Sequence, residues 1–180
     1  MTRLTYPRSV SIAELTRSTT PWQGQGLLAD FERLSLEPAH PQPEVRVDFQ
    51  AHGSQRPDAS GALAPWLRLQ GQVRLSLLCQ RCLAPVEVDV VFDREFRFVA
   101  TEEEAQSQDD ESEEDVLVSS PHFDLLALAE DEFLMAVPVA PKHAKCPQDL
   151  PFSATDADFE ADEPAPHPFA KLAQLKTPKS

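Results

Sequence analysis

Two long runs of alternating apolar and polar residues do most to limit what this chain can fold into. Residues 66–77 and 86–98 place apolar side chains along one face, and Gly71 interrupts the first run. These side chains are Leu67, Leu69, Val73, Leu75 and Leu77 in the first run, and Val86, Val88, Val90, Phe92, Phe96 and Phe98 in the second. A period of two is typical of strands that bury one face. The runs therefore predict two long antiparallel strands joined by the short stretch between them.

Shorter patterns predict the elements before this hairpin. Ser11 and Glu14 fit a capping box, which predicts a short helix. Residues 26–37 carry apolar side chains at helical spacing, which predicts a second helix. Alternation in residues 45–49 predicts a strand near 44–50, and residues 52–65 are expected to form a loop.

A longer helix is predicted near residues 123–136. Ser120 and Pro121 suit its N-cap and first turn, apolar residues follow at helical intervals, and Pro138 limits its C-terminal end. With the strands near 44–50, 66–78 and 85–99, this helix predicts an α+β fold in which an antiparallel sheet is packed by a helix. The pattern leaves open whether the sheet closes into a small barrel.

One α+β domain is expected over residues 1–146, with a disordered acidic insertion near 101–118. Within it, residues 102–115 contain nine carboxylates and no basic or aromatic residue. Such a segment cannot bury enough apolar surface to become ordered, so it is predicted to be a solvated linker.

Residues 147–180 are predicted to be a flexible, disordered tail, since the stretch 147–168 is rich in Pro, Asp and Glu. A short basic amphipathic helix is expected near 168–176, where Phe169, Leu172 and Leu175 recur at helical spacing beside Lys171, Lys176 and Lys179. This segment can pack on its own domain, on a partner or on RNA.

The charge balance limits the partners. Sixteen basic residues against 30 acidic ones give a formal net charge of -14, which disfavours extensive direct contact with nucleic acid. An acidic surface suits a basic partner such as a ribosomal protein, and it also serves solubility. No apolar run approaches the length of about eighteen residues that spans a bilayer, so we expect a cytoplasmic protein with no membrane partner.

Cys79 and Cys82 lie at the predicted hairpin tip, and Cys146 is the third cysteine of the chain. A tight turn can direct two thiolates toward one zinc ion, and His143 and Cys146 offer two further ligands at the same spacing. Cys79, Cys82, His143 and Cys146 can then form a tetrahedral site. A dithiol redox centre and plain structural thiols in a turn are the alternatives, because one C-x-x-C pair alone does not identify a metal site.

Glu130, Asp131 and Glu132 lie in the predicted long helix. A solvated flank is the simpler interpretation of these acids, and a grip on a basic partner is the other. The predicted partner-binding residues are Arg81, Glu130, Asp131, Glu132, Phe169, Leu172 and Lys176.

Three separated stretches, "LLCQRCLAPVEVDV", "DLLALAEDEFLMAVPVAPKHAKC" and "HPFAKLAQLK", resemble the YceD family, named for accumulation of large-subunit ribosomal RNA. The resemblance covers the chain from about residue 65 to the C-terminus. The family's recurrent positions correspond here to Cys79, Arg81, Cys82, Asp124, Leu125, Glu132, Pro138, His143, Cys146, Pro168, Phe169 and Ala170.

The resemblance implies a bacterial, non-enzymatic ribosome-biogenesis factor with a role in synthesis, processing or stability of 23S rRNA. The expected partners are a large-subunit ribosomal protein or precursor rRNA, with no small-molecule substrate and with zinc as the candidate cofactor. Direct RNA binding through a zinc-knuckle-like hairpin is the alternative. A hydrolase acting on RNA is disfavoured, since the sequence shows no catalytic cluster of carboxylates and no nucleophile beside a base.

Overall fold

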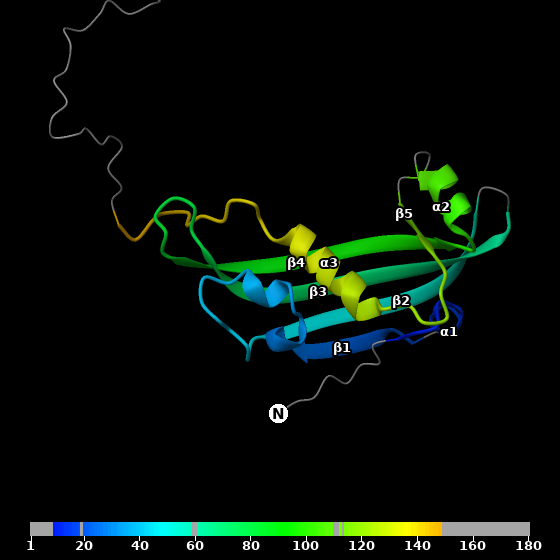
Figure 1. The fold of residues 1–180 in the computed structure, drawn as a ribbon, viewed down its shortest axis with the longest axis horizontal. Helices are drawn as coiled ribbons and strands as arrows, with labels where there is room; N and C mark the ends of the chain where they lie inside the picture. Colours follow the sequence, from blue (N-terminus) through cyan, green and yellow to red (C-terminus); the bar gives the residue numbers. More distant parts are fainter. Residues whose placement is uncertain (1–8, 19, 59–60, 110–111, 113, 149–180) are drawn as a thin grey trace, which may run out of the picture. The chain divides into compact units, whose positions relative to one another are not determined.

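A five-stranded sheet is the centre of the computed structural model, which describes residues 9–18, 20–58, 61–109, 112 and 114–148 (Figure 1). The strands lie in the order β1-β2-β3-β4-β5. Their bounds are Trp22–Leu27 (β1), Arg46–Pro57 (β2), Leu63–Leu78 (β3), Pro85–Val99 (β4) and Asp115–Val118 (β5). The first four strands are antiparallel neighbours, and β5 runs parallel to β4. Because β1 and β5 are the edges, the described strands form an open, mostly antiparallel sheet and not a barrel.

The β3–β4 hairpin confirms the predicted alternation. Its register runs from Trp66 opposite Arg97 to Leu78 opposite Pro85, and all five apolar side chains predicted to face inward from β3 are buried. Gly71 interrupts this row of apolar side chains because two aromatic rings occupy the space that a side chain at this position would need. A Cβ atom at Gly71 would lie 2.4 Å from Phe92 Cε1 and 2.6 Å from Phe133 Cζ.

The predicted long helix is present as α3, Leu125–Ala136, which lies across one face of the sheet (Figure 1). Phe133 of α3 packs edge-to-face on Phe92 of β4 and on Phe31, at centroid distances of 4.8 and 6.1 Å. Its N-cap is Asp124, whose side chain accepts a hydrogen bond from the Ala127 N–H at 2.9 Å. The assignment of the helix start to Ser120 and Pro121 was therefore wrong by about one turn.

The region before the hairpin differs from its prediction. Residues 26–37 do not form a helix; β1 ends at Leu27, and two short 3-10 helices follow, η1 (Leu28–Asp30) and η2 (Leu34–Leu36). Their apolar residues still enter the core, because Leu28, Phe31 and Leu34 are fully buried. The helical spacing of apolar residues therefore predicted correctly which side chains are buried, but it did not predict the backbone conformation.

Two further expectations near the N-terminus need correction. A short helix, α1, is present at Ile12–Leu15, but Ser11 caps it without a side-chain hydrogen bond, so the capping box is absent. Most of the expected loop at 52–65 is a continuation of β2 and β3, which pair as far as Pro57 opposite Leu63.

The acidic segment is ordered where the structure describes it. Residues Glu102–Asp109 form a helix, α2, and Asp115–Val118 form β5, so the prediction of a disordered linker was wrong for these residues. Arg97 of β4 supplies the missing counter-charge: its guanidinium donates to Glu114 at 2.9 Å, to Gln108 at 2.6 Å and to Ser112 at 2.8 Å. The stabilising group lies outside the acidic run, and the composition of the run could not reveal it.

The sheet face opposite α3 is polar and carries paired charges. Arg68 and Arg74 of β3 bond to Asp93 and Asp89 of β4, each with a closest distance of 2.6 Å. Arg56 of β2 reaches across β3 to Glu95 of β4 at 2.7 Å. Hydrogen bonds from these arginines lower the pKa of each carboxylate partner. This face therefore presents balanced charges and not a basic patch.

The chain divides after Cys146 into two units. Within the second unit, the structure describes only Pro147 and Gln148, so the predicted flexible tail and its amphipathic helix near 168–176 lie outside the described residues. No helix among the described residues is both long enough and apolar enough to cross a membrane.

Candidate metal centre

The hairpin tip between β3 and β4 places two cysteines on one turn. The Cys79 N–H donates to the Ala84 carbonyl at 3.0 Å, and the Leu83 N–H donates to the Cys79 carbonyl at 2.9 Å. Leu83 has a φ of 59°, in the left-handed region that side chains rarely adopt. These contacts fix the turn that holds Cys79, which is buried, beside Cys82, which is half-buried.

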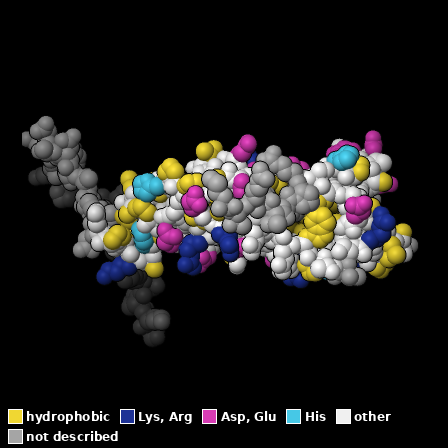
Figure 2. Space-filling view, turned by 90° about the horizontal axis from the view of Figure 1, so that it is seen from below, with side chains coloured by type: hydrophobic (Ala, Val, Ile, Leu, Met, Phe, Trp, Pro, Cys, Tyr) yellow, Lys and Arg dark blue, Asp and Glu magenta, His cyan; other side chains and the backbone are white. Residues whose placement is uncertain are grey.

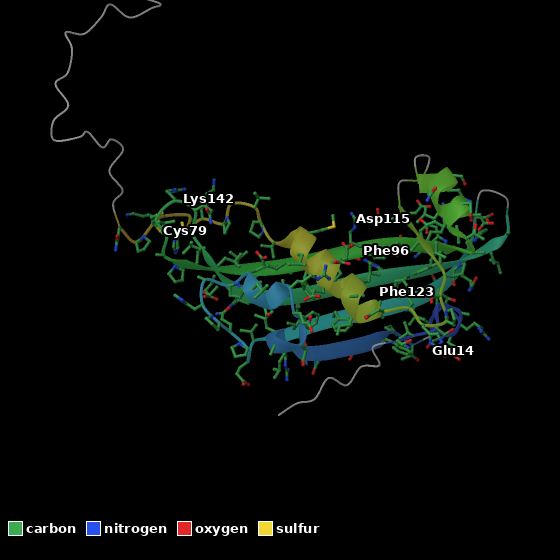
Figure 3. All side chains as sticks on the ribbon, in the orientation of Figure 1. Glu14, Cys79, Phe96, Asp115, Phe123 and Lys142 are labelled. Atoms are coloured by element: carbon green, nitrogen blue, oxygen red, sulfur yellow. The ribbon has the colours of Figure 1, made fainter. Side chains whose placement is uncertain are left out.

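The segment after α3 folds back onto this turn (Figure 3). The Gln80 N–H donates to the carbonyl of Pro141 at 2.8 Å, and Pro141 itself is buried. The contact brings together two parts of the chain that lie about sixty residues apart, which spacing alone could not establish.

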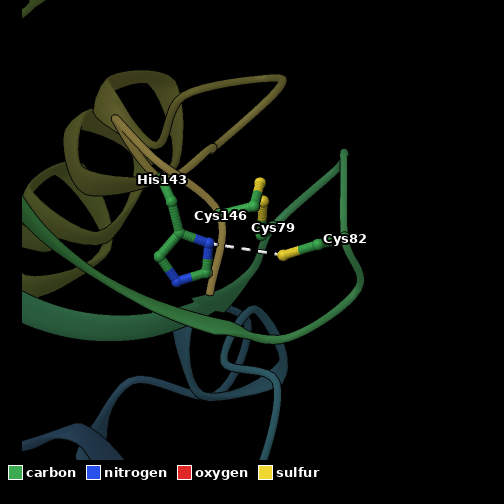
Figure 4. Close-up of side chains that lie close together, drawn as sticks. All are labelled: Cys79, Cys82, His143 and Cys146. Carbon is green, nitrogen blue, oxygen red and sulfur yellow. Dashed lines mark hydrogen bonds between the residues drawn. The ribbon is translucent and has the colours of Figure 1, made fainter. Parts of the chain in front are cut away.

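The four predicted metal ligands lie together at this junction (Figure 4). Cys79, Cys82, His143 and Cys146 each offer one ligand atom, and these four atoms all lie within 4.8 Å of one another. Three sulfurs and one imidazole nitrogen form a donor set typical of structural zinc sites. The group can therefore hold a metal ion.

The orientation of His143 suits this role. Its Nε2 lies 3.0 Å from the Pro85 carbonyl oxygen, and its Nδ1 lies 3.4 Å from Cys82 Sγ. Because a carbonyl can only accept, Nε2 carries the proton and donates it to Pro85. The lone pair of Nδ1 is then directed at the thiols, in the arrangement by which a second hydrogen bond orients a metal-binding histidine.

The thiols of the cluster differ in acidity. Burial opposes ionisation of Cys79, but the backbone groups of Cys82, His143 and Arg81 and the side chain of Cys82 outweigh it and lower the pKa of Cys79 to about 5. Burial, with hydrogen bonds and negative charge from Cys82 and Cys79, raises the pKa of Cys146. Without metal, the cluster thus favours a thiolate on Cys79, stabilised by neighbouring N–H groups.

The three predicted acids of α3 serve the fold in different ways. Glu130 is buried and accepts from the backbone N–H groups of Arg33 and Leu34 at 2.7 and 3.1 Å, while Asp131 pairs with the Arg33 side chain at 2.6 Å. Glu132 is also buried. The interpretation of a solvated flank was therefore wrong for Glu130 and Glu132.

The burial of Glu132 raises the pKa of its carboxyl, and the nearby Arg94, at 3.6 Å, opposes that shift. Among the other predicted partner-binding residues, Arg81 is exposed at the hairpin tip. Phe169, Leu172 and Lys176 lie outside the described residues.

Three contributors to the site were missed from the sequence: the carbonyls of Pro85 and Pro141, and the backbone of Leu83. Each acts through the main chain, and a main-chain acceptor leaves no residue-type signal. The two prolines were the available indication of a special backbone conformation here, because residues that flank a proline favour extended or turn conformations.

The fold and the site define an α+β protein in which a β-hairpin tip and the segment after a packed helix share a four-residue Cys/His centre. A family model, "Large ribosomal RNA subunit accumulation protein YceD", matches residues 67–176. The chain belongs to this family, as its resemblance predicted. The matched range contains most of β3, all of β4 and α3, and all four residues of the centre. Comparison with solved structures found no match.

Family membership connects the protein with the accumulation of large-subunit ribosomal RNA. The name describes an outcome in the cell and assigns no chemical step to any residue. The function of the site therefore has to be argued from its own geometry.

Proposed function

We propose that this protein is a non-enzymatic, cytoplasmic ribosome-biogenesis factor that supports synthesis, processing or stability of 23S rRNA through contacts with large-subunit ribosomal proteins or precursor rRNA. The observation that carries the proposal is the match to the family of rRNA accumulation proteins over the hairpin, α3 and the Cys/His centre. A role through contacts agrees with the exposed carboxylates of the polar sheet face. Asp89, Asp93 and Glu95 are bound to arginines, with lowered pKa values that do not suit a general base at neutral pH.

The proposal includes a structural zinc ion at Cys79, Cys82, His143 and Cys146. Its support is the donor set, the mutual distances within 4.8 Å and the Nε2 hydrogen bond of His143 to Pro85. Bound zinc would join the hairpin tip to the segment after α3 and hold both in one shape. All four protein ligands would be used, so the ion would have no open position for a substrate.

The charge of the chain supports a basic protein as one partner. With a net charge of -14 and six of its arginines occupied by carboxylates, most of its surface favours contact with basic ribosomal proteins over contact with phosphate. A small-molecule substrate and an RNA-hydrolysing role are not part of this proposal.

A tagged pull-down from bacterial cytosol, divided into samples with and without nuclease, tests this function. We expect large-subunit ribosomal proteins to remain on the bait after nuclease treatment, and 23S rRNA to decrease in cells that lack the protein. Normal 23S rRNA in those cells, or purified protein that cleaves precursor rRNA, would contradict the proposal. For zinc, metal analysis of protein purified without chelator should give about one ion per chain.

A further inference from the structure

The end of the molecule that carries the Cys/His centre differs in charge from the rest of the described surface. Arg81, Lys142 and Lys145 are exposed, and each adjoins a residue of the centre in the chain. Since the ligand atoms lie within 4.8 Å of one another, the three cations branch from backbone segments that meet at one centre. Figure 3 labels Lys142 beside Cys79 at this end.

These cations are available, whereas most other described cations are not. Arg33, Arg56, Arg68, Arg74, Arg94 and Arg97 form ion pairs with carboxylates. Within the described part of the chain, Arg81, Lys142 and Lys145 form none, and Arg17 and Arg46 are the other unpaired cations. An acidic protein has thus kept three unneutralised positive charges at its Cys/His end.

Exposed apolar side chains accompany these charges. Leu83 is 68% exposed, Val139 is fully exposed, and Leu78 is 40% exposed. Figure 2 shows hydrophobic, histidine and basic side chains close together at the end that lies to the left in both views. Among the described residues, the large apolar side chains that are well exposed include no aromatic ring.

We infer that the Cys/His end, comprising Arg81, Lys142 and Lys145 with the exposed apolar side chains Leu78, Leu83 and Val139, is a contact surface for the phosphate backbone of RNA. The three unpaired cations favour a polyanion as the ligand. The proposed function makes rRNA the expected polyanion, so the inference rests on that function. Phosphate contacts position a protein without reading sequence, so this surface is expected to bind RNA independently of its sequence. The acidic remainder of the protein confines this contact to one end.

The test uses full-length protein purified without chelator and a labelled single-stranded RNA of mixed sequence, about 16 nucleotides long, the upper site size of many single-strand-binding domains. One variant combines Arg81→Gln, Lys142→Gln and Lys145→Gln. A matched control combines Arg56→Gln, Arg68→Gln and Arg74→Gln, which changes the net charge equally but on the face with paired charges. Zinc content and circular dichroism establish that both variants are folded.

Three phosphate contacts predict that log K falls with log salt at a slope of about -2, since each contact on a single strand contributes about -0.7. At about 0.15 M salt the first variant should bind roughly 50-fold more weakly, with the salt dependence nearly abolished. The control should bind within about twofold of the wild type, because its arginines are neutralised and distant charges are screened. A second RNA of unrelated sequence should bind equally.

Three results would overturn the inference: unchanged RNA binding in the first variant, an equal loss in the control, or displacement of RNA by polyglutamate at equal charge concentration. The last result would indicate an acidic protein as the ligand. The pull-down after nuclease is a separate readout. If ribosomal proteins persist there while purified protein does not bind RNA, the proposed function stands and this surface assignment fails.

Discussion

The two ends of strand β4 show two ways of ordering a polar segment. At its start, the turn and residues 139–146 converge on a Cys/His centre. At its end, an acidic segment is held by Arg97, which is only 8% exposed. Neither segment buries much apolar surface, so each depends on a few specific groups. The difference is that a ligand set appears in the sequence as paired residues, whereas the counter-charges Arg97 and Arg94, which lie on β4 outside the acidic segment, do not.

Metal removal should have the largest effect, and it should be confined to one end. In a Cys82→Ser variant we expect zinc affinity to fall by at least about 100-fold, since even outer contacts to a ligand typically contribute about 10–100-fold. Hydrogen exchange should accelerate at residues 139–146 and at the hairpin tip. The sheet and α3 should remain folded, because the aromatic core around Phe133 lies outside the centre.

The acidic end supplies the control for this experiment. A chelator should leave exchange in α2 and β5 unchanged. If chelation also loosens these elements, the two ends are not independent and the comparison fails.

Arg97→Ala should have the next largest effect, at the opposite end. The change removes a nearly buried guanidinium and leaves Glu114, Gln108 and Ser112 without their donor, which we expect to cost about 2–3 kcal/mol. Exchange in α2 should accelerate while zinc content stays the same. Unfolding by denaturant and exchange measured by mass spectrometry provide the readouts.

Arg74→Ala is the matched variant on the same hairpin. Its partner Asp89 is well exposed, so the loss should be at most about 0.5 kcal/mol. Equal losses in the two variants would show that Arg97 does not order the acidic segment.

The sequence predicted the parts of the fold that depend on long patterns. Alternation in β3 and β4 located the hairpin, its buried face and the turn with Cys79 and Cys82, and apolar periodicity located α3. Strands without a long apolar pattern were not predicted. The sequence of β1, Trp-Gln-Gly-Gln-Gly-Leu, has no apolar alternation, and the ring of Phe49 occupies the space above Gly24. A strand whose packing is supplied by a side chain of the neighbouring strand cannot be predicted from its own residues.

The same limit applies to the candidate site. Residue type and spacing indicated the four ligands, but their meeting depends on the hydrogen bond from Gln80 to the Pro141 carbonyl, which no residue type encodes. Conversely, three adjacent acids in α3 resembled a solvated flank, although Glu130 binds the start of η2 from a distant part of the chain. Long-range partners explain both outcomes.

Titration of the metal-free protein should distinguish the two ends by their chemistry. The pKa of Cys79 is about 5, below the ordinary value of 9.0, so between these values the folded centre binds fewer protons than the unfolded chain. Its contribution to stability is therefore complete above pH 9 and is lost as the pH falls through about 5. Ultraviolet absorbance of the thiolate should show a midpoint near pH 5.

A Cys79→Ser variant is the control for this titration. The midpoint near pH 5 should be absent from this variant, and the raised pKa of Cys146 places ionisation of that thiol at higher pH. A low midpoint that survives in this variant would assign the thiolate to another cysteine.

Leu83→Gly should have a small effect of the opposite sign. Leu83 follows the second cysteine of the turn at φ 59°, where a side chain typically costs about 1–2 kcal/mol, and its side chain is 68% exposed. Glycine removes that cost but loses about 0.5–1 kcal/mol through its freer unfolded chain, so we expect a net gain of up to about 1 kcal/mol. That gain corresponds to a zinc affinity up to about fivefold higher, measured by competition with a chelator.

Gly61→Ala, at φ 84° in the β2–β3 turn, should destabilise the fold without changing zinc affinity. If Leu83→Gly weakens zinc binding, the leucine side chain supports the centre, and the turn is not simply a strained backbone held by its ligands.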